Sequence, residues 1–96
     1  MNLIINGNEI VDLESFYDAL MVSGKFPEHF GRNGMALWDS LTGDVERPLK
    51  IIWNDSNVTR RNMQHGAFDR IVNLLRKVEQ LDDECGYEEK FTLELN

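Results

Sequence analysis

The sequence predicts an α/β fold in which a three-stranded parallel sheet, with its strands in the order 1-2-3, packs against about four helices. Three short apolar segments, at residues 1–5, 49–53 and 91–95, have the length and composition of strands. Helical patterns fill both long intervals between them, and strands joined by such crossovers pair in parallel. With 96 residues the chain has room for one core, so residues 1–96 are expected to form a single domain.

The first strand is expected to end at the turn Asn6-Gly7-Asn8, whose residue types favour tight turns. Asp12 is a suitable N-cap for a first helix, and Gly24 would end that helix because glycine readily adopts a positive φ. Between these two residues, apolar side chains recur at the spacing of one helix face and are expected to be buried. They are Leu13, Phe16, Tyr17, Leu20 and Met21.

A second helix is predicted over residues 34–42, with Asn33 as its N-cap and Gly43 as its end. The strand that follows, residues 49–53, is almost continuously apolar, which is typical of a central strand. Its last residue, Trp53, is expected to lie in the core.

The second crossover begins with residues 58–65, which are expected to form a short helix. A helix of about four turns is predicted from Gly66 onward. The acidic residues 82–89 are expected to form a solvated turn. Alternating apolar and polar residues over 91–95 then predict an edge strand with one buried face. The apolar stripe of the four-turn helix consists of Phe68, Ile71, Val72, Leu74, Leu75, Val78 and Leu81.

The composition excludes several classes of protein. A formal net charge of −7 at pH 7 disfavours binding to nucleic acid and favours a basic protein partner. No apolar run approaches the roughly 20 residues of a membrane span, and the N-terminus lacks the pattern of a secretory signal. Cys85, expected to be partly buried, is the only cysteine, so an internal disulfide and a multi-cysteine zinc site are excluded. We therefore expect a cytoplasmic protein, monomeric when free, with no cofactor and no membrane contact.

The second predicted helix has an unusual outer face. At 100° per residue, Leu37 and Leu41 lie on the side that faces the core, Trp38 lies at its border, and Met35 and Asp39 point away. Met and Trp are enriched at the centres of protein interfaces, and Met adapts to a partner's shape. Two interpretations stay open: a binding face, or a stray exposed Met beside a solvated carboxylate.

The segment from Phe26 to Gly43 resembles the signature segment of the barstar family, small acidic intracellular inhibitors of secreted barnase-type ribonucleases. Ile5-Asn6-Gly7 and Pro48-Leu49 match at the same separations, and the run Ala36-Leu37-Trp38-Asp39 is the most specific part. The resemblance extends from the first strand to the last, although after Trp53 it is mainly one of pattern. It implies a three-stranded parallel sheet with four helices, which agrees with the order predicted from periodicity.

The resemblance also implies a mechanism of inhibition. A ribonuclease cleft is basic because it holds RNA phosphates, and the inhibitor would insert its second helix and the preceding loop there. Asp39 matches the family's anchoring aspartate, whose carboxylate replaces a phosphate and forms charge-assisted hydrogen bonds with Arg and His of the enzyme. Opposite net charges would speed the encounter. The implied contact residues are Asp39, Met35, Trp38, Asn33, Gly43, Asp44, His29 and Lys77.

Four of these positions depart from the family's contact surface. By the resemblance, Met35 stands where the prototype has a second Asp one turn before its anchor, His29 stands in place of a contact Tyr, and Asp44 replaces an aromatic residue. Lys77 aligns with a contact Glu, although the alignment also allows Arg76 at that position. Most of these changes alter charge or polarity, which is how specificity is rewritten on a kept scaffold. We therefore expect a non-enzymatic inhibitor, of the immunity-protein kind, of a basic ribonuclease or nuclease toxin other than barnase.

Other functions remain as alternatives. His29 and His65, with Asp39 or Glu28, would be candidates for acid–base chemistry or a metal site, but no nucleophile or ligand spacing supports either. A barstar-fold interaction module without ribonuclease inhibition is the second interpretation. A small hydrolase or an RNA-binding domain is a third, which the composition and motifs do not support.

Between residues 55 and 77 five cations stand against two acidic residues. They could form a patch for RNA or for an acidic partner, or they could be solvated charges on separate faces, which is the interpretation we favour. The five are Arg60, Arg61, Arg70, Arg76 and Lys77.

Overall fold

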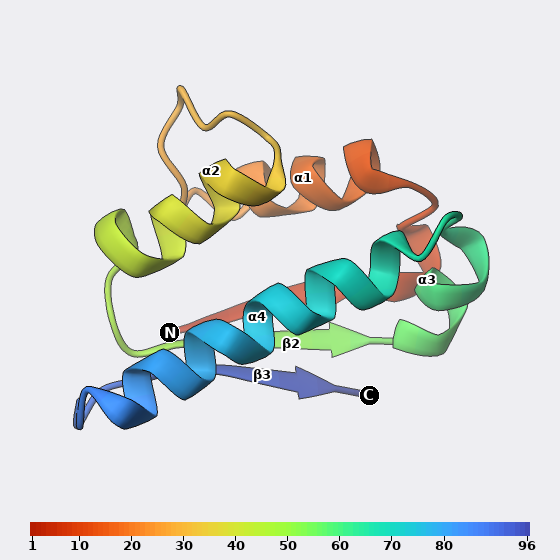
Figure 1. The fold of residues 1–96 in the computed structure, drawn as a ribbon. Coiled ribbons are helices and arrows are strands. Elements are labelled where there is room, and N and C mark those ends of the chain that lie inside the picture. The colour runs from red at the N-terminus through yellow and green to blue at the C-terminus, as the bar shows by residue number, and fades with distance from the viewer.

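The computed structural model describes all residues, 1–96, and shows the predicted parallel sheet and its helices (Figure 1). The sheet has the order β1-β2-β3, with β1 at Asn2–Asn6, β2 at Leu49–Asn54 and β3 at Phe91–Leu95. The helices are α1 (Leu13–Val22), α2 (Gly34–Asp39), α3 (Ser56–Asn62) and α4 (Ala67–Glu84). A short helical turn, η1 (Gly7–Glu9), follows β1, and a π-helical turn, η2 (Ser40–Asp44), continues α2. None of these helices combines the length and the apolar character needed to cross a membrane.

One face of the sheet carries the core. Alternate residues of every strand are buried on that face, and α4 crosses it diagonally (Figure 1). Parallel pairing places Leu3 beside Ile51 and Ile51 beside Leu93, so buried apolar side chains form a row across the sheet. The predictions of a central β2, a buried Trp53 and an edge strand β3 are confirmed.

The start of α1 agrees with the prediction, whereas its buried stripe is shorter. The Asp12 carboxylate accepts from Ser15 N at 2.8 Å, and the Ser15 hydroxyl accepts from Asp12 N, so the cap is reciprocal. The prediction of burial is wrong for Leu13, which is 41% exposed because it is the first helical residue, beside an open hollow. Burial is confirmed for Phe16, Tyr17 and Leu20.

The boundaries of three other predicted features differ from the structure. Gly43 does not end the second helical segment, because the chain continues through η2 to Asp44. The short helix of the second crossover, α3, begins and ends earlier than predicted, over Ser56–Asn62. Cys85 is exposed rather than partly buried, because it follows the last residue of α4 at an open end of the helix.

Gly7 allows three segments to meet at the carboxyl end of the sheet. A Cβ atom at Gly7 would lie 2.2 Å from the Asn54 carbonyl oxygen and 2.7 Å from the Thr59 hydroxyl, so no larger residue fits. The Thr59 hydroxyl donates to the Gly7 carbonyl at 2.7 Å and accepts from the Trp53 indole N–H at 3.1 Å. These buried bonds join the ends of β1 and β2 to α3.

The predicted acidic turn is wrong in its first residues. Helix α4 continues to Glu84, and Asp82 is 2% exposed. Asp82 stands four residues after the buried Val78, so it continues the same helical stripe into the core. Burial of a carboxylate requires a partner, and the structure supplies one.

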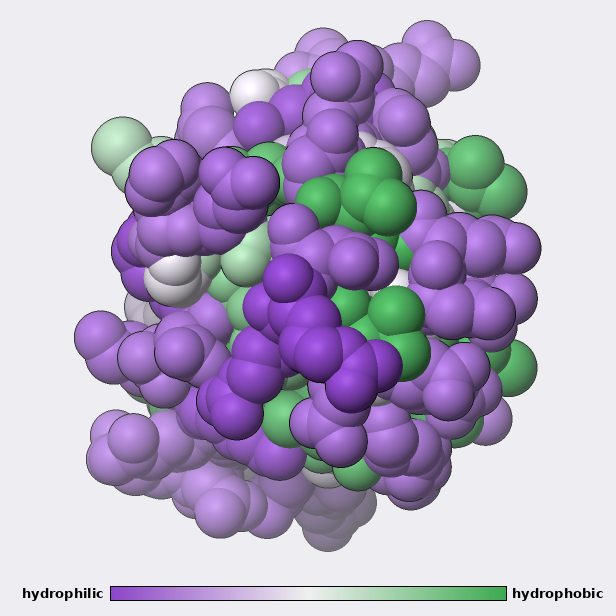
Figure 2. Space-filling model, turned by 90° about the vertical axis from the view of Figure 1, so that its right-hand side faces the viewer, coloured by the Kyte–Doolittle hydropathy of each residue, from purple (hydrophilic) through white to green (hydrophobic).

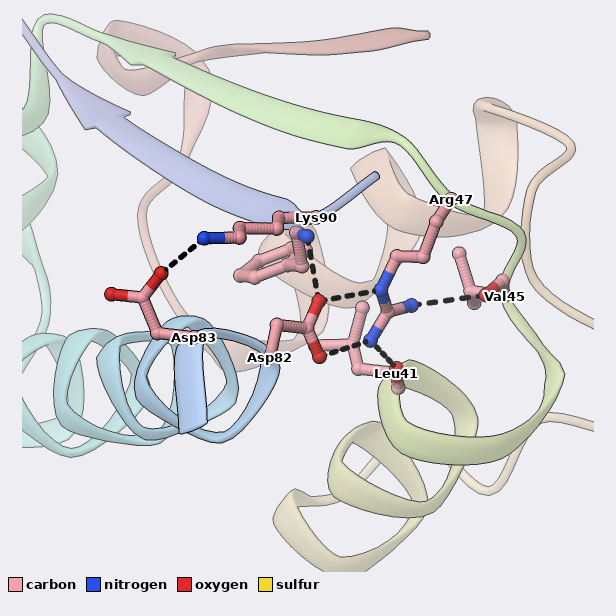
Figure 3. A network of polar contacts seen from close by, with 7 residues as sticks. Leu41, Val45, Arg47, Asp82, Asp83 and Lys90 are labelled. Atoms are coloured by element: carbon pink, nitrogen blue, oxygen red, sulfur yellow. Dashed lines mark hydrogen bonds and ion pairs between the residues drawn. The ribbon is translucent and has the colours of Figure 1, made fainter. Parts of the chain in front are cut away.

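The partner of Asp82 is Arg47, in the loop before β2 (Figure 3). The Arg47 guanidinium donates to the Asp82 carboxylate through Nε at 2.8 Å, and it also donates to the carbonyl oxygens of Leu41 and Val45. Asp82 in turn accepts from Phe91 N at 2.7 Å. This network, which we call the Arg47–Asp82 pair, joins η2 and the lead into β2 to α4 and the start of β3.

Helix α4 also covers the free edge of β3. The Glu79 carboxylate accepts from Leu93 N at 2.7 Å, and Arg76 donates to the Leu93 carbonyl at 2.9 Å. Together with the bond from Phe91 N to Asp82, these contacts occupy backbone groups of β3 that face away from β2. Residues 76, 79 and 82 can all reach the backbone of β3 because they lie three residues apart along one side of α4.

The Arg47–Asp82 pair should contribute strongly to stability. We expect Asp82→Asn to lower the free energy of unfolding by about 3 kcal/mol, because it leaves the Arg47 guanidinium without its counter-charge in a largely buried place. Urea denaturation followed by circular dichroism measures this. Asp83→Asn is the matched control: its carboxylate is exposed and pairs with Lys90, so the expected loss is below about 0.5 kcal/mol. Equal losses in the two variants would contradict the assignment.

The same pair should make stability depend on pH. Burial raises the pKa of Asp82, but hydrogen bonds from Arg47 and Phe91 N, with the charges of Arg47 and Lys90, outweigh it and hold that pKa below 3.8. A carboxylate whose pKa is lower in the folded than in the unfolded state adds stability at pH values above its unfolded pKa. This added stability is lost as the pH falls through its folded pKa.

We therefore expect the stability difference between wild type and Asp82→Asn to be constant above about pH 5 and to shrink below about pH 4. Denaturation of both proteins at a series of pH values measures it, and the subtraction removes the contribution of other carboxylates. A difference that stays constant down to pH 3 would refute the pKa assignment.

Candidate functional site

The loop before α2 is anchored on both sides. Phe26 and Phe30 are buried, with ring centroids 5.2 Å apart, and Phe30 also packs against Tyr17 of α1. Arg32 pairs with the Asp18 carboxylate and donates to a carbonyl oxygen of α1. These contacts on both sides fix the position of the loop and therefore of the first residues of α2.

Helix α2 begins at Asn33, as predicted. The Asn33 side-chain oxygen accepts from Ala36 N at 2.9 Å, which satisfies one of the free N–H groups of the first turn. Leu37 and Leu41 are fully buried, and they fix which side of the helix faces the core.

The opposite side of α2 is open, as the helical wheel predicts. Met35 is 80% exposed, which is unusual for so large an apolar side chain. Asp39, one turn later, is exposed and forms no ion pair within the chain. Trp38 lies at the border of this open side and is half-buried against the core.

An open groove separates this face of α2 from α4. Its volume is about 640 Å³, within the roughly 300–1,000 Å³ of ligand-sized hollows. The two helices approach closely at one end, where a Cβ atom on Gly34 would lie 3.9 Å from the Leu74 side chain. The groove is lined by Gly34, Met35, Trp38 and Asp39 from α2 and by Arg70, Asn73, Leu74 and Lys77 from α4.

The groove brings together half of the residues expected at the binding site. Met35, Trp38, Asp39 and Lys77 all line it. Arg76, which the alignment also allowed, instead donates to the edge of β3, so Lys77 is the residue that faces α2.

The other four expected residues lie outside the groove. Asn33 is engaged in capping α2, and His29 is exposed in the preceding loop. Gly43 is exposed in η2, and Asp44 lines a different hollow near Lys25. None of the four lines the groove.

Of the wall that α4 contributes, the resemblance implied Lys77, whereas sequence reasoning missed Arg70, Asn73 and Leu74 as site residues. Arg70, Asn73, Leu74 and Lys77 recur at the spacing of one helix face, which was visible in the sequence. The packing of that face beside α2 was not, because it depends on how the two crossovers lie on the sheet.

A second hollow, of about 570 Å³, lies between the start of α1 and the α3–α4 connection. Figure 2 shows a side of the molecule that is mainly hydrophilic, with small separate apolar patches.

The two histidines do not converge on one site. His65 lines the second hollow, whereas His29 lines neither this hollow nor the groove between α2 and α4. No group of three or more His, Cys, Asp or Glu side chains is placed to hold a metal ion.

The five cations of residues 55–77 do not form one patch. Arg60 pairs with Asp69 and covers the Phe68 ring, and Arg76 pairs with Glu79 at the sheet edge. Only Arg70 and Lys77 line the same groove. The interpretation as charges on separate faces therefore fits the structure.

Comparisons with known proteins add an independent finding. A family model described as Barstar (barnase inhibitor) matches residues 1–95. A protein of Bacillus subtilis (strain 168) named "Putative ribonuclease inhibitor YrdF" is 33% identical to this chain over 82 residues, which is 85% of this chain and 90% of that protein. The match to the family model includes both helices that form the groove.

The open face of α2 should be dispensable for folding. We expect Met35→Ala and Asp39→Ala each to change the free energy of unfolding by less than about 0.5 kcal/mol, because both side chains are exposed and Asp39 has no partner to lose. Leu37→Ala, on the buried side of the same helix, should cost about 2–5 kcal/mol. Urea denaturation compares the three. A loss near that of Leu37→Ala in either exposed variant would show that the face is part of the core.

Proposed function

The chain belongs to the barstar family, and from this premise we propose that it inhibits a ribonuclease by placing the open face of α2 in the enzyme's active-site cleft. The observation that carries the proposal is Asp39, an exposed carboxylate without an internal partner, beside an exposed Met and a half-buried Trp. The proposed contacts around it are Asn33, Met35, Trp38, Gly43, Asp44, His29 and Lys77.

A free carboxylate can replace a phosphate in a cleft that binds RNA. Cationic side chains that hold a phosphodiester can donate equally to the two oxygens of Asp39, and such charge-assisted bonds are about twice as strong as neutral ones. Inhibition follows because the substrate phosphate is excluded from its site. The net charge of −7 favours the encounter with a basic enzyme.

The apolar neighbours of Asp39 support an anchoring role. Residues that dominate binding are surrounded by contacts that exclude water, and a charge pair is strongest where water is absent. Met35 and Trp38 line the same groove as Asp39 and can provide this surrounding. Trp is also among the residues most enriched at such centres.

The face is held in place before any partner binds. Asn33 caps α2, and Arg47 donates to the Leu41 carbonyl oxygen of η2 and to the Val45 carbonyl oxygen just after η2. A preorganised face loses little conformational entropy on binding, which favours high affinity.

We propose that the natural target differs from barnase. Met35 and Lys77 stand where the resemblance implies acidic residues, so the groove offers less negative charge to a basic cleft. The proposed role is that of an immunity protein, a cytoplasmic single-domain monomer that neutralises a ribonuclease or nuclease toxin, and not that of an enzyme. A barstar-fold interaction module without inhibition is the alternative, and Lys77 in the groove is the observation that favours it.

The role of Asp39 can be measured with barnase as the probe enzyme. Two parent proteins are used: the wild type, and a double variant, Met35→Asp with Lys77→Glu, that restores the charges implied by the family. In any parent that inhibits barnase, we expect Asp39→Ala to weaken inhibition at least 100-fold, about 2.7 kcal/mol. Central charged residues of interfaces cause losses of this size.

Glu46→Ala is the matched control, because Glu46 is an exposed acidic residue outside the groove. It should change inhibition less than threefold, as expected for a peripheral charge. If Asp39→Ala has an effect no larger than Glu46→Ala in a parent that inhibits barnase, the proposed role of Asp39 fails. A wild type that does not inhibit barnase agrees with a different natural target.

A further inference from the structure

We propose that the groove between α2 and α4 recognises a partner surface that presents a cation to Asp39 and an acidic side chain to Lys77. This inference rests on the proposed function and adds the chemistry of the target. A ribonuclease that fits the groove carries a carboxylate on the wall of its cleft that meets α4, beside the cations that bind phosphate.

The α4 wall of the groove is cationic. Arg70 and Lys77 are seven residues apart on one helix face, with Asn73 and Leu74 between them, and all four line the groove. No acidic side chain of α4 lines it. Asp69 and Glu79, the carboxylates of this helix that are nearest in sequence to Arg70 and Lys77, pair with Arg60 and Arg76.

Lys77 is exposed and free to bind. It forms no ion pair within the chain, although Asp39 lines the same groove. Arg70 is partly engaged, because its guanidinium donates to the His65 carbonyl oxygen. The two walls therefore keep opposite, unneutralised charges, Asp39 on α2 and Lys77 on α4.

A partner with cations on both sides would bind poorly. Like charges placed against each other in an interface cost several kcal/mol, so a second cation facing Lys77 would offset the attraction to Asp39. A partner carboxylate facing Lys77 removes that cost and adds a second charge pair. Met35, Trp38 and Leu74 line the groove with these charges, so both pairs would lie beside apolar surface that excludes water.

A carboxylate is a normal component of a ribonuclease cleft, because Glu and Asp act as general bases or acids in proton transfer. The groove would then contact two features of the enzyme: Asp39 would pair with a cation that binds phosphate, and Lys77 would pair with a neighbouring carboxylate. Recognition of both gives specificity, since a cleft with only cations is rejected at α4.

A charge exchange with barnase tests this. The probe is a panel of barnase variants, each with one cleft Lys or Arg replaced by Glu, and binding is measured by calorimetry because some of these variants lose activity. We expect at least one variant to bind the wild-type inhibitor ten times or more tighter than barnase itself does. Lys77→Glu should remove that gain and bind unaltered barnase more tightly than the wild type does.

Arg61→Glu makes the same charge change on α3, outside the groove, and should keep the gain. Lys77→Gln should give an intermediate result, and circular dichroism confirms that each variant is folded. If no barnase variant gains tenfold, or if the gain survives in Lys77→Glu, the inference is overturned. When binding still depends on Asp39, that outcome leaves the proposed function standing. Absence of binding in every combination also overturns this inference, because the inference requires that at least one barnase variant binds.

Discussion

The Arg47–Asp82 pair is the interaction on which the arrangement of this molecule depends. Asp82 lies on the buried stripe of α4, and Arg47 reaches it from the loop before β2 while donating to carbonyl oxygens of Leu41 and Val45 (Figure 3). One guanidinium therefore fixes η2, which continues α2, against the end of α4. The pair therefore holds the segment that follows α2 against α4, and these two helices form the walls of the groove.

The structure separates the residues that make the fold from those that face a partner. Gly7, Thr59 and Trp53 form a buried hydrogen-bonded junction that tolerates no larger residue at Gly7. Met35 and Lys77, in contrast, are exposed and hold nothing in place. Substitutions at such positions change charge at little cost in stability, so one scaffold can acquire a new target without refolding.

The spacing of apolar residues in the sequence predicts most of the fold, because it reflects which side chains are buried. Phe16 and the stripe of α4 were predicted from helical spacing, Trp53 from its place at the end of an almost continuous apolar run, and the outward direction of Asp39 from the helical wheel. Asp82 was misjudged because burial of a carboxylate depends on a cation 35 residues away, which spacing does not reveal. Apart from Lys77, which the resemblance implied, the α4 wall of the groove was missed for a related reason: its residues share a helix face, but only the packed sheet sets that face beside α2.

The central claim is that Asp39 takes the place of a phosphate in a ribonuclease cleft. A crystal structure of the inhibitor bound to a barnase-type ribonuclease that it inhibits tests this most directly. The account predicts that the Asp39 carboxylate oxygens lie about 2.7–3.0 Å from Arg, Lys or His nitrogens of the enzyme's phosphate site. A complex in which Asp39 remains in solvent, or in which α3 or the open face of the sheet contacts the enzyme instead, would contradict it.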